Sequence, residues 1–500
     1  MSRIRVDWRV SLALTGRVLV YLAGPLCFPL ILALYYGESP VPFLAAIAVT
    51  LALGGAMHFV SRDSGALGAR EAFLAVSLIW LLVAAVGAVP FVIAGVGNIA
   101  HPINAMFESM SGLTTTGATV ILDFSVHDRS ILMWRQLIQW LGGLGVLILV
   151  TAILSELGVG GAQLMETETQ TQNVNRLTPR ISETARLIWG LYVGITLVAI
   201  AVFYGIALLG LDPQMDLYNA VAHAFTSVAT AGFSPEPESV GAFAPITQWA
   251  VVPFMILGST SFILLYFFIN GEPMRLLKNE EFHFYLGVLA AFSGLSAAFL
   301  LFSSELEMGL EATLRHAVFN VVSIVTTTGY ASMDFDTWPA AAKLLLFLGM
   351  FVGGMVGSTT CSIKSLRWLV VLKSLRRNLF TAVHPEAIRP VRISGRPVDE
   401  QTIRDIYVYV LLSIVLFVFL AVFIVADGAR AGVDVSEFEA IGAAASTFLN
   451  IGPAFGMAGP YGSYAEFPAA TRVVMIVLMW IGRIEIIPVL VLFTTAFWRS

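Results

Sequence analysis

The chain has 500 residues, of which 57% are hydrophobic and only 12% are charged, and its mean hydropathy is +0.83. This composition is typical of a helical protein that crosses a membrane several times, because about 20 apolar helical residues span the hydrocarbon core. It excludes a soluble protein. The net charge of −5 says little about partners, since in a membrane protein the placement of charge matters more than its sum.

The side-chain inventory excludes further classes. Cys27 and Cys361 are the only cysteines, so neither a disulfide framework nor a cysteine metal cluster is available. The seven histidines share no metal-ligand spacing, and no nucleotide-binding glycine pattern precedes a helix. The apolar runs also lack the paired carboxylates or nucleophile–histidine sets that hydrolytic chemistry needs. We therefore expect no enzyme, no cofactor and no nucleic-acid partner, only a lipid bilayer around the chain.

Ten long apolar runs predict ten membrane-spanning helices. The first run follows Arg3, Arg5 and Arg9 and lacks a small-residue cleavage site, so we expect a retained span rather than a signal peptide. The predicted spans cover residues 11–35, 41–60, 72–96, 131–155, 184–210, 246–270, 284–303, 341–375, 405–427 and 470–498.

Basic residues gather in alternate loops. The largest group runs from Lys373 to Arg396, whereas the loops predicted on the opposite side are acidic. Because Lys and Arg are enriched in cytoplasmic loops, both termini are expected in the cytoplasm. The other groups expected inside are Arg3/Arg5/Arg9, Arg62/Arg70, Arg176/Arg180 and Arg275/Lys278.

Four shorter apolar segments are too short to cross a membrane and are predicted as re-entrant pore helices at 102–114, 216–229, 311–326 and 436–449. Their starts carry helix signals: Pro102 suits a first turn, Asp216 an N-cap, and Ser436 with Glu439 a capping box. An all-α fold of two leading spans and four repeats of span, pore helix and span follows. The predicted divisions are 1–66 for the leading spans and 67–160, 161–272, 273–390 and 391–500 for the four repeats.

Each pore helix ends in a glycine-containing turn. In order, the turns are Thr114-Thr115-Thr116-Gly117-Ala118, Ala229-Thr230-Ala231-Gly232-Phe233, Thr326-Thr327-Thr328-Gly329-Tyr330 and Leu449-Asn450-Ile451-Gly452-Pro453. Non-helical backbone at membrane depth is tolerated only where it is buried in protein or lines a watery path. Glycine permits dihedrals that aim carbonyls at one centre, and the helix C-terminus favours a cation. We predict a central, carbonyl-lined cation pore, which potassium, sodium or both could use.

The eighth span is too long for one crossing and carries a run of small and hydroxyl residues. This run, "GGMVGSTT" at 353–360, predicts unwound backbone that lines a cavity; the alternative is a simple kink between two helices. The residues of interest are Gly353, Gly354, Gly357, Ser358 and Thr359.

Arg483 lies inside an apolar run, where an unpaired charge costs about 3 kcal/mol on insertion scales. It should face water or a partner. Glu485 is a poor partner, because a residue two positions further along the same helix points to a different face. Backbone carbonyls of the broken eighth span are one alternative. Glu108 is expected to pack or cap rather than bind an ion, and Lys364 and Arg367 are expected to be simple interfacial anchors.

Several segments together resemble the Trk/Ktr/HKT superfamily of potassium transporters. They include "FESMSGLTTTGATV" (107–120), "QWLGGLGVLILV" (139–150), "GGMVGSTTCSIKSLR" (353–367) and "IGRIEIIPVLVLF" (481–493), and the resemblance covers nearly the whole chain. The two extra leading spans resemble the TrkH type more than the shorter KtrB type. One departure is that Cys361 and Ser362 stand where the family often has paired glycines, which puts the mobility of this loop in doubt.

The resemblance implies potassium uptake across the bacterial cytoplasmic (inner) membrane by a gated homodimer that binds a TrkA-like nucleotide-binding ring. It implies that the broken span obstructs the pore and that Arg483 is an electrostatic barrier below the filter. A cation symporter that couples K⁺ to H⁺ or Na⁺, or a mixed Na⁺/K⁺ pathway, is the alternative. The selectivity-filter residues that the resemblance implies are Thr115, Thr116, Gly117, Thr230, Ala231, Gly232, Thr327, Thr328, Gly329, Asn450, Ile451 and Gly452.

Overall fold

The computed structural model describes residues 6–60, 68–149, 181–303, 306 and 308–499. These residues are predominantly helical, and their only strands form a hairpin of β1 (Arg392–Ile393) and β2 (Arg396–Pro397). The predicted all-α class is confirmed. Several predictions concern residues outside the described ranges: the end of the fourth span at 150–155, the basic residues Arg3, Arg5, Arg62, Arg176 and Arg180, and Glu305 and Glu307 of the acidic loop.

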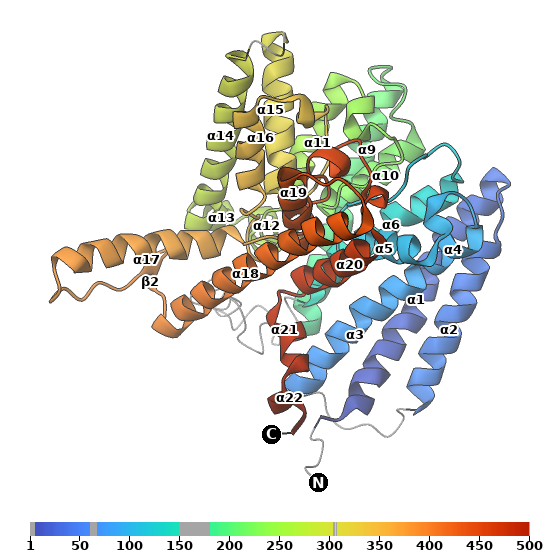
Figure 1. Ribbon diagram of the computed structural model, residues 1–500, viewed down its shortest axis with the longest axis horizontal. Helices are drawn as coiled ribbons and strands as arrows, with labels where there is room; N and C mark the ends of the chain where they lie inside the picture. Colours follow the sequence, from blue (N-terminus) through green and yellow to red (C-terminus); the bar gives the residue numbers. More distant parts are fainter. Residues whose placement is uncertain (1–5, 61–67, 150–180, 304–305, 307, 500) are drawn as a thin grey trace.

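The two leading spans are α1 (Trp8–Tyr36) and α2 (Val41–Val60), which lie side by side (Figure 1). Their backbones approach closely at Gly16 and Gly54, where a Cβ on either glycine would lie 2.7 Å from the other's carbonyl oxygen. Small residues permit this packing between apolar helices, which have no hydrophobic driving force within a bilayer. The pair packs mainly against the first repeat.

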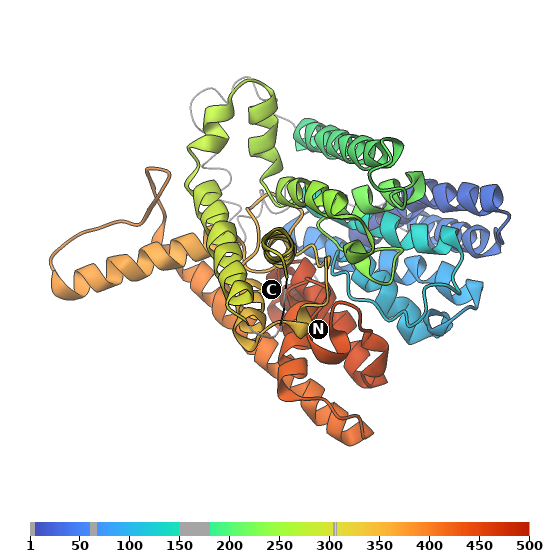
Figure 2. The same cartoon turned by 90° about the horizontal axis from the view of Figure 1, so that it is seen from above.

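The four repeats follow one another around a common centre when the molecule is seen from above (Figure 2). The first contains α3 (Ala69–Gly87), α4 (Val89–Ala94), α5 (Pro102–Leu113) and α6 (Arg129–Leu149). The second contains α9 (Ile181–Leu208), α10 (Leu217–Val228), α11 (Pro245–Gly258) and α12 (Phe262–Ile269). The third contains α13 (Pro273–Leu277), α14 (Glu280–Leu301), α15 (Leu310–Val325), α16 (Ala340–Gly349) and α17 (Ser365–Val383). The fourth contains α18 (Glu400–Ala431), α19 (Glu437–Phe448), α20 (Ala469–Arg483), α21 (Ile487–Leu490) and α22 (Thr495–Arg499). Short 3₁₀ turns in the connections are η1 (Asn98–Ala100), η4 (Ser239–Ala242), η5 (Phe335–Thr337), η6 (Gly456–Ala458), η7 (Tyr464–Glu466) and η8 (Val491–Phe493).

The pore helices are α5, α10, α15 and α19, and the starts of α5, α10 and α19 follow the predicted signals. Pro102 is the first residue of α5, and the Asp216 side chain accepts a hydrogen bond from the amide of Asn219 at 2.8 Å. Ser436 and Glu439 form the reciprocal capping box of α19. Each cap satisfies amides that a helix start leaves without a partner, so these predictions are confirmed.

Six described helices are long and apolar enough to cross a membrane, or up to eight if each of two bent pairs counts as one span. The predicted spans at 246–270 and 470–498 are each bent, because α11 and α12 meet at 103° and α20 bends by 114° into α21 and η8. The first bend is stabilised by outside donors: the amide of Thr359 bonds the Gly258 carbonyl and that of Met355 bonds the Ser259 carbonyl. Hydropathy does not register such a bend, because both arms are equally apolar.

Candidate ion-conducting site

The four glycine turns share one backbone conformation. Their second residues, Thr115, Thr230, Thr327 and Asn450, have φ of 53°, 49°, 51° and 56°. Their glycines, Gly117, Gly232, Gly329 and Gly452, have φ of 79°, 80°, 80° and 112°. Left-handed dihedrals are unfavourable for residues with a Cβ, and such strain clusters at functional sites. The same strain at equivalent places in four repeats indicates a shared geometric requirement.

The turns direct their amides into their own pore helices. The amides of the third residues, Thr116, Ala231, Thr328 and Ile451, bond the carbonyls of Ser111, Thr226, Ser323 and Ser446 at 2.8, 2.9, 2.8 and 2.9 Å. In a planar trans peptide the carbonyl points opposite to the amide, so the carbonyls of the second residues face away from the helices. No hydrogen bond to these four carbonyl oxygens is found in the described part of the chain. They are available to replace water around a cation.

The turns close into a ring. A Cβ on Gly117 would lie 2.3 Å from the Ala231 carbonyl oxygen, and one on Gly232 would lie 1.9 Å from that of Thr328. A Cβ on Gly329 would lie 2.0 Å from the Ile451 oxygen, and one on Gly452 would lie 2.7 Å from the Thr116 oxygen. Each glycine therefore abuts the next turn, and the fourth returns to the first. All twelve predicted filter residues meet in this ring.

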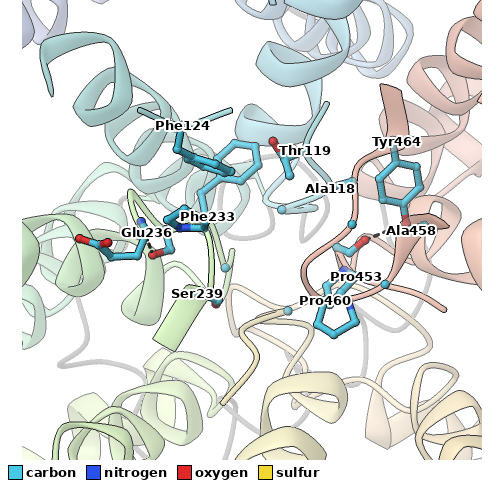
Figure 3. A pocket seen from close by; sticks show the side chains of 18 of the residues that line it. Ala118, Thr119, Phe124, Phe233, Glu236, Ser239, Pro453, Ala458, Pro460 and Tyr464 are labelled. Carbon is cyan, nitrogen blue, oxygen red and sulfur yellow. Dashed lines mark hydrogen bonds between the residues drawn. The ribbon is translucent and has the colours of Figure 1, made fainter. Parts of the chain in front are cut away.

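A pocket opens onto the ring, and its lining includes all four glycines. Figure 3 shows ribbon from all four repeats around it, with Phe233 and Glu236 of the second repeat opposite Tyr464 and Pro453 of the fourth. Glu236 is half-buried and adds a carboxylate to the entrance. The hydroxyl of Tyr464 donates a 2.8 Å hydrogen bond to the Gly452 carbonyl, so the fourth turn is held from the pocket side.

Glu108 does not face the ring, which agrees with the expectation that it packs or caps rather than binds an ion. It forms a buried ion pair with Arg135 of α6 at 2.7 Å and accepts a hydrogen bond from the amide of Val120 at 2.8 Å. Arg135 also donates to the Ser234 carbonyl at 3.2 Å, and its guanidinium lies 4.1 Å from the centre of the Phe233 ring. The pair thus ties the segment after the first turn to the segment after the second. Sequence spacing gave no sign of Arg135 as the partner.

A non-helical segment separates α16 from α17, so the alternative of a simple kink is wrong. This segment, residues 350–364, is called the gate loop below. Its Thr359 hydroxyl lies 2.8 Å from that of Thr230, and the amide of Cys361 donates to the Thr327 hydroxyl at 3.1 Å. The gate loop therefore contacts the second and third turns directly. Gly353, Gly354, Gly357 and Ser358 all lie in it, and a Cβ on Gly354 would meet the Ser259 carbonyl at 2.6 Å.

Arg483 ends α20 and is 2% exposed. Its Nη1 donates to the Thr359 carbonyl at 2.8 Å and lies 2.8 Å from the Cys361 sulfur, and its Nη2 donates to the Gly142 carbonyl of α6 at 3.1 Å. The structure therefore shows the predicted alternative, in which Arg483 binds carbonyls of the broken span. Cys361 and Ser362, where the sequence departs from the superfamily, both make contacts. Cys361 meets Arg483, and the Ser362 hydroxyl donates to the Met350 carbonyl at 2.7 Å.

Lys364 and Arg367 are buried, so the expectation of simple interfacial anchors is wrong. The ammonium of Lys364 bonds the carbonyl and hydroxyl of Thr360, and Arg367 pairs with Glu485. The guanidinium of Arg367 also lies 3.8 Å from the centre of the Tyr409 ring. Glu485 can reach Arg367 because it has left the helix, with φ of 65°. These contacts join residues far apart in sequence, and residue spacing carries no signal of them.

Taken together, a strained carbonyl ring, a pocket that opens onto it and a loop against it define a helical membrane protein with the parts of a cation pathway. Potassium or another cation would be its cargo; no group of three or more His, Cys, Asp and Glu side chains suited to a metal ion occurs in the described ranges.

Comparison with known proteins agrees with this class. The TrkH family of cation transport proteins matches residues 41–305 and 306–500. The Trk system potassium uptake protein TrkH of Halomonas elongata is 34% identical over 98% of this chain and 99% of that protein. TrkH of Escherichia coli K12 is 31% identical over 99% and 100%. The crystal structure of the potassium transporter TrkH from Vibrio parahaemolyticus superimposes with a TM-score of 0.88 at 30% identity, covering 99% of this chain and 100% of that one. The chain belongs to the TrkH family.

Proposed function

We propose that this protein takes up potassium across the bacterial cytoplasmic membrane through a gated, carbonyl-lined filter. The observation that carries the proposal is the closed ring of four turns, in which each glycine abuts the carbonyl of the next turn. Relatives that match this chain along nearly their full length are named potassium uptake proteins, and this supports potassium as the ion. The proposed filter residues are the twelve predicted residues of the four turns. The proposed repeat boundaries are those that the sequence predicts.

The gate loop and Arg483 form the proposed gate. The loop contacts the second and third turns, and Arg483 fixes it to α6, so a cation that leaves the ring meets backbone and a buried positive charge. A guanidinium in a low-dielectric path repels cations strongly. In the proposal, opening requires the loop to leave this position.

Regulation and assembly are part of the proposal. The relatives' names place them in a Trk system, which supports a cytoplasmic nucleotide-binding regulator of the TrkA type. The proposed assembly is a homodimer, as the family resemblance implies. The basic residues of α17 and the β1–β2 hairpin support a cytoplasmic location for that end, with both termini on the same side. α17 projects from the body of the molecule in both Figure 1 and Figure 2.

Uptake of K⁺, Rb⁺ and Na⁺ by a potassium-uptake-deficient bacterium that expresses the chain tests the function. K⁺ and Rb⁺ uptake with restored growth at low K⁺ is expected, and uptake of Na⁺ alone would contradict it. Imposing a proton or sodium gradient on proteoliposomes distinguishes the coupled alternative, because a symporter would drive K⁺ against its own gradient whereas a channel-like pathway would not.

A further inference from the structure

We propose that Gln139, in the middle of α6, is a specificity-determining positioning residue of the second turn. This inference rests on the proposed function and adds a residue outside the four turns to the parts that set ion selectivity. It starts from a difference between the turns.

The first and third turns are braced internally. The hydroxyls of Thr114 and Thr116 lie 2.7 Å apart, and so do those of Thr326 and Thr328. The second turn has Ala229 and Ala231 at these positions and cannot form this bond. The carbonyl groups of the second turn must therefore be held in the ring by other side chains, since a filter needs its oxygens at fixed distances from the ion.

Gln139 supplies a clamp that brackets Gly232. Its Nε2 donates to the Ala231 carbonyl at 2.7 Å, and its Oε1 accepts from the amide of Phe233 at 3.0 Å. The side chain is fully buried, so water does not compete for either bond. One amide therefore fixes the peptide groups on both sides of the glycine, the residue of the turn whose backbone dihedrals are least restricted by its side chain.

The clamped oxygen is also part of the ring closure. The Ala231 carbonyl is the atom that a Cβ on Gly117 would meet at 2.3 Å, so its position sets the spacing between the first and second turns. Gln139 belongs to the first repeat and grips the second, one helical turn from Arg135, which bonds the Ser234 carbonyl. Losing the clamp frees the carbonyl to rotate and widens the range of ion sizes that the ring accepts.

Gln136 provides a matched control three residues earlier on α6. It is also fully buried, but neither of its amide atoms has a hydrogen-bond partner in the described part of the chain. Gln136→Leu and Gln139→Leu therefore remove the same group from the same helix, and only the second removes bonds to the turn.

The test is the K⁺/Na⁺ permeability ratio of the full-length protein in liposomes, with wild type, Gln139→Leu, Gln139→Glu and Gln136→Leu compared. We expect a fall of about three- to tenfold for Gln139→Leu, the factor of one net hydrogen bond, and no change for Gln136→Leu. Gln139→Glu keeps an acceptor for Phe233 but opposes a carboxylate to the Ala231 carbonyl, so its ratio should fall too. This variant serves if Gln139→Leu does not fold.

Three results would overturn the inference: a wild-type ratio in both folded Gln139 variants, an equal fall in Gln136→Leu, or a lower total flux at an unchanged ratio. The last would show a structural role only. Wild-type protein that passes no K⁺ would instead refute the proposed function, so the two failures are distinguishable.

Discussion

Four glycines carry the ring because each stands where a Cβ has no room and where φ is positive. A substituted residue would have to move either its own turn or the neighbouring carbonyl, and both belong to the ring. The strain is tolerated because the turn amides are fixed to the pore helices and the surrounding side chains are buried.

Gly329→Ser is expected to weaken discrimination between K⁺ and Na⁺. Its Cβ would lie 2.0 Å from the Ile451 carbonyl, which must shift by about an ångström to reach the shortest contact real Cβ atoms make, 3.0 Å. We expect the K⁺/Na⁺ flux ratio in liposomes to fall about tenfold, a change of about 1.4 kcal/mol in relative barrier. Gly287→Ser on α14 is the control, because no atom apart from its chain neighbours and its own helix backbone lies within 4 Å of the place that its Cβ would take. An unchanged ratio in Gly329→Ser would count against the filter assignment.

Glu108→Gln tests the buried ion pair at the same scale. It leaves the Arg135 charge without its carboxylate, and breaking one side of a buried pair typically costs about 3–5 kcal/mol. We expect a clear drop in the thermal unfolding temperature in detergent. The double variant Glu108→Gln, Arg135→Met should recover part of the loss, and a double variant less stable than either single one would contradict this explanation.

At the scale of elements, the gate loop depends on helices that end early. α11 stops at Gly258 and α20 at Arg483, and both helix ends bond the loop. The Gly258 carbonyl accepts a hydrogen bond from the Thr359 amide, and the Arg483 side chain donates one to the Thr359 carbonyl. A continuous α11 would occupy the Gly258 carbonyl itself, so the first bend leaves this acceptor free for the loop. At the second bend, α20 ends with Arg483, whose side chain reaches the loop.

Arg483→Ala is expected to raise basal K⁺ flux in the absence of a regulator, since it removes both the buried charge and the bridge between the gate loop and α6. Arg483→Lys separates the two effects, because it keeps a charge but cannot span both carbonyls as a planar guanidinium does. Low flux in the lysine variant would indicate an electrostatic barrier, and high flux would indicate a tether. Flux in Arg483→Ala equal to or below that of wild type would contradict both roles.

One contact between repeats is made by a carboxylate, so its strength depends on pH. The Asp336 carboxylate accepts a 2.7 Å hydrogen bond from the amide of Gly456 and so joins the third repeat to the fourth. The pKa of Asp336 is raised to about 6, mainly by burial, with smaller upward contributions from Asp334 and Glu439 that the Gly456 amide and Lys343 oppose. The folded protein therefore binds this proton more tightly than the unfolded chain does, and the resulting stabilisation is present below about pH 4 and lost as pH rises through about 6.

The prediction concerns Asp336→Asn, which keeps an acceptor for Gly456 without a charge. Relative to wild type, its thermal stability in detergent should improve as the pH rises from about 4 to about 7. A stability difference that does not vary with pH would contradict the proposed shift.

For the whole molecule, the sequence was most informative where a pattern repeats. Four glycine turns after four short apolar helices predicted the pore helices within a few residues, because caps, length and turn chemistry are local. Bends at Ser259 and Glu485 were missed, because hydropathy measures only how apolar a segment is. Gln139 was missed as well, although a glutamine in the middle of an apolar run is itself a signal of a polar partner. Its partner lies in another repeat, and that proximity is set only by the folded ring.

The ring has fourfold backbone symmetry but unequal support. Hydroxyl pairs brace the first and third turns, Gln139 clamps the second, and the Asn450 amide donates to the Thr116 hydroxyl and the Met479 carbonyl in the fourth. Different side chains thus hold one carbonyl arrangement. A common ion site would explain why the backbone is alike in all four repeats while its supports differ.

The most direct measurement is the reversal potential of the purified protein in a planar bilayer, with K⁺ on one side and Na⁺ at equal concentration on the other. At equal concentrations the K⁺/Na⁺ permeability ratio sets this potential, so a carbonyl ring fitted to K⁺ predicts a large potential that is negative on the K⁺ side, and Gly329→Ser should move it toward zero. A wild-type reversal potential near zero, with clear current, would show that the ring does not select between the two ions and would contradict the proposed potassium filter.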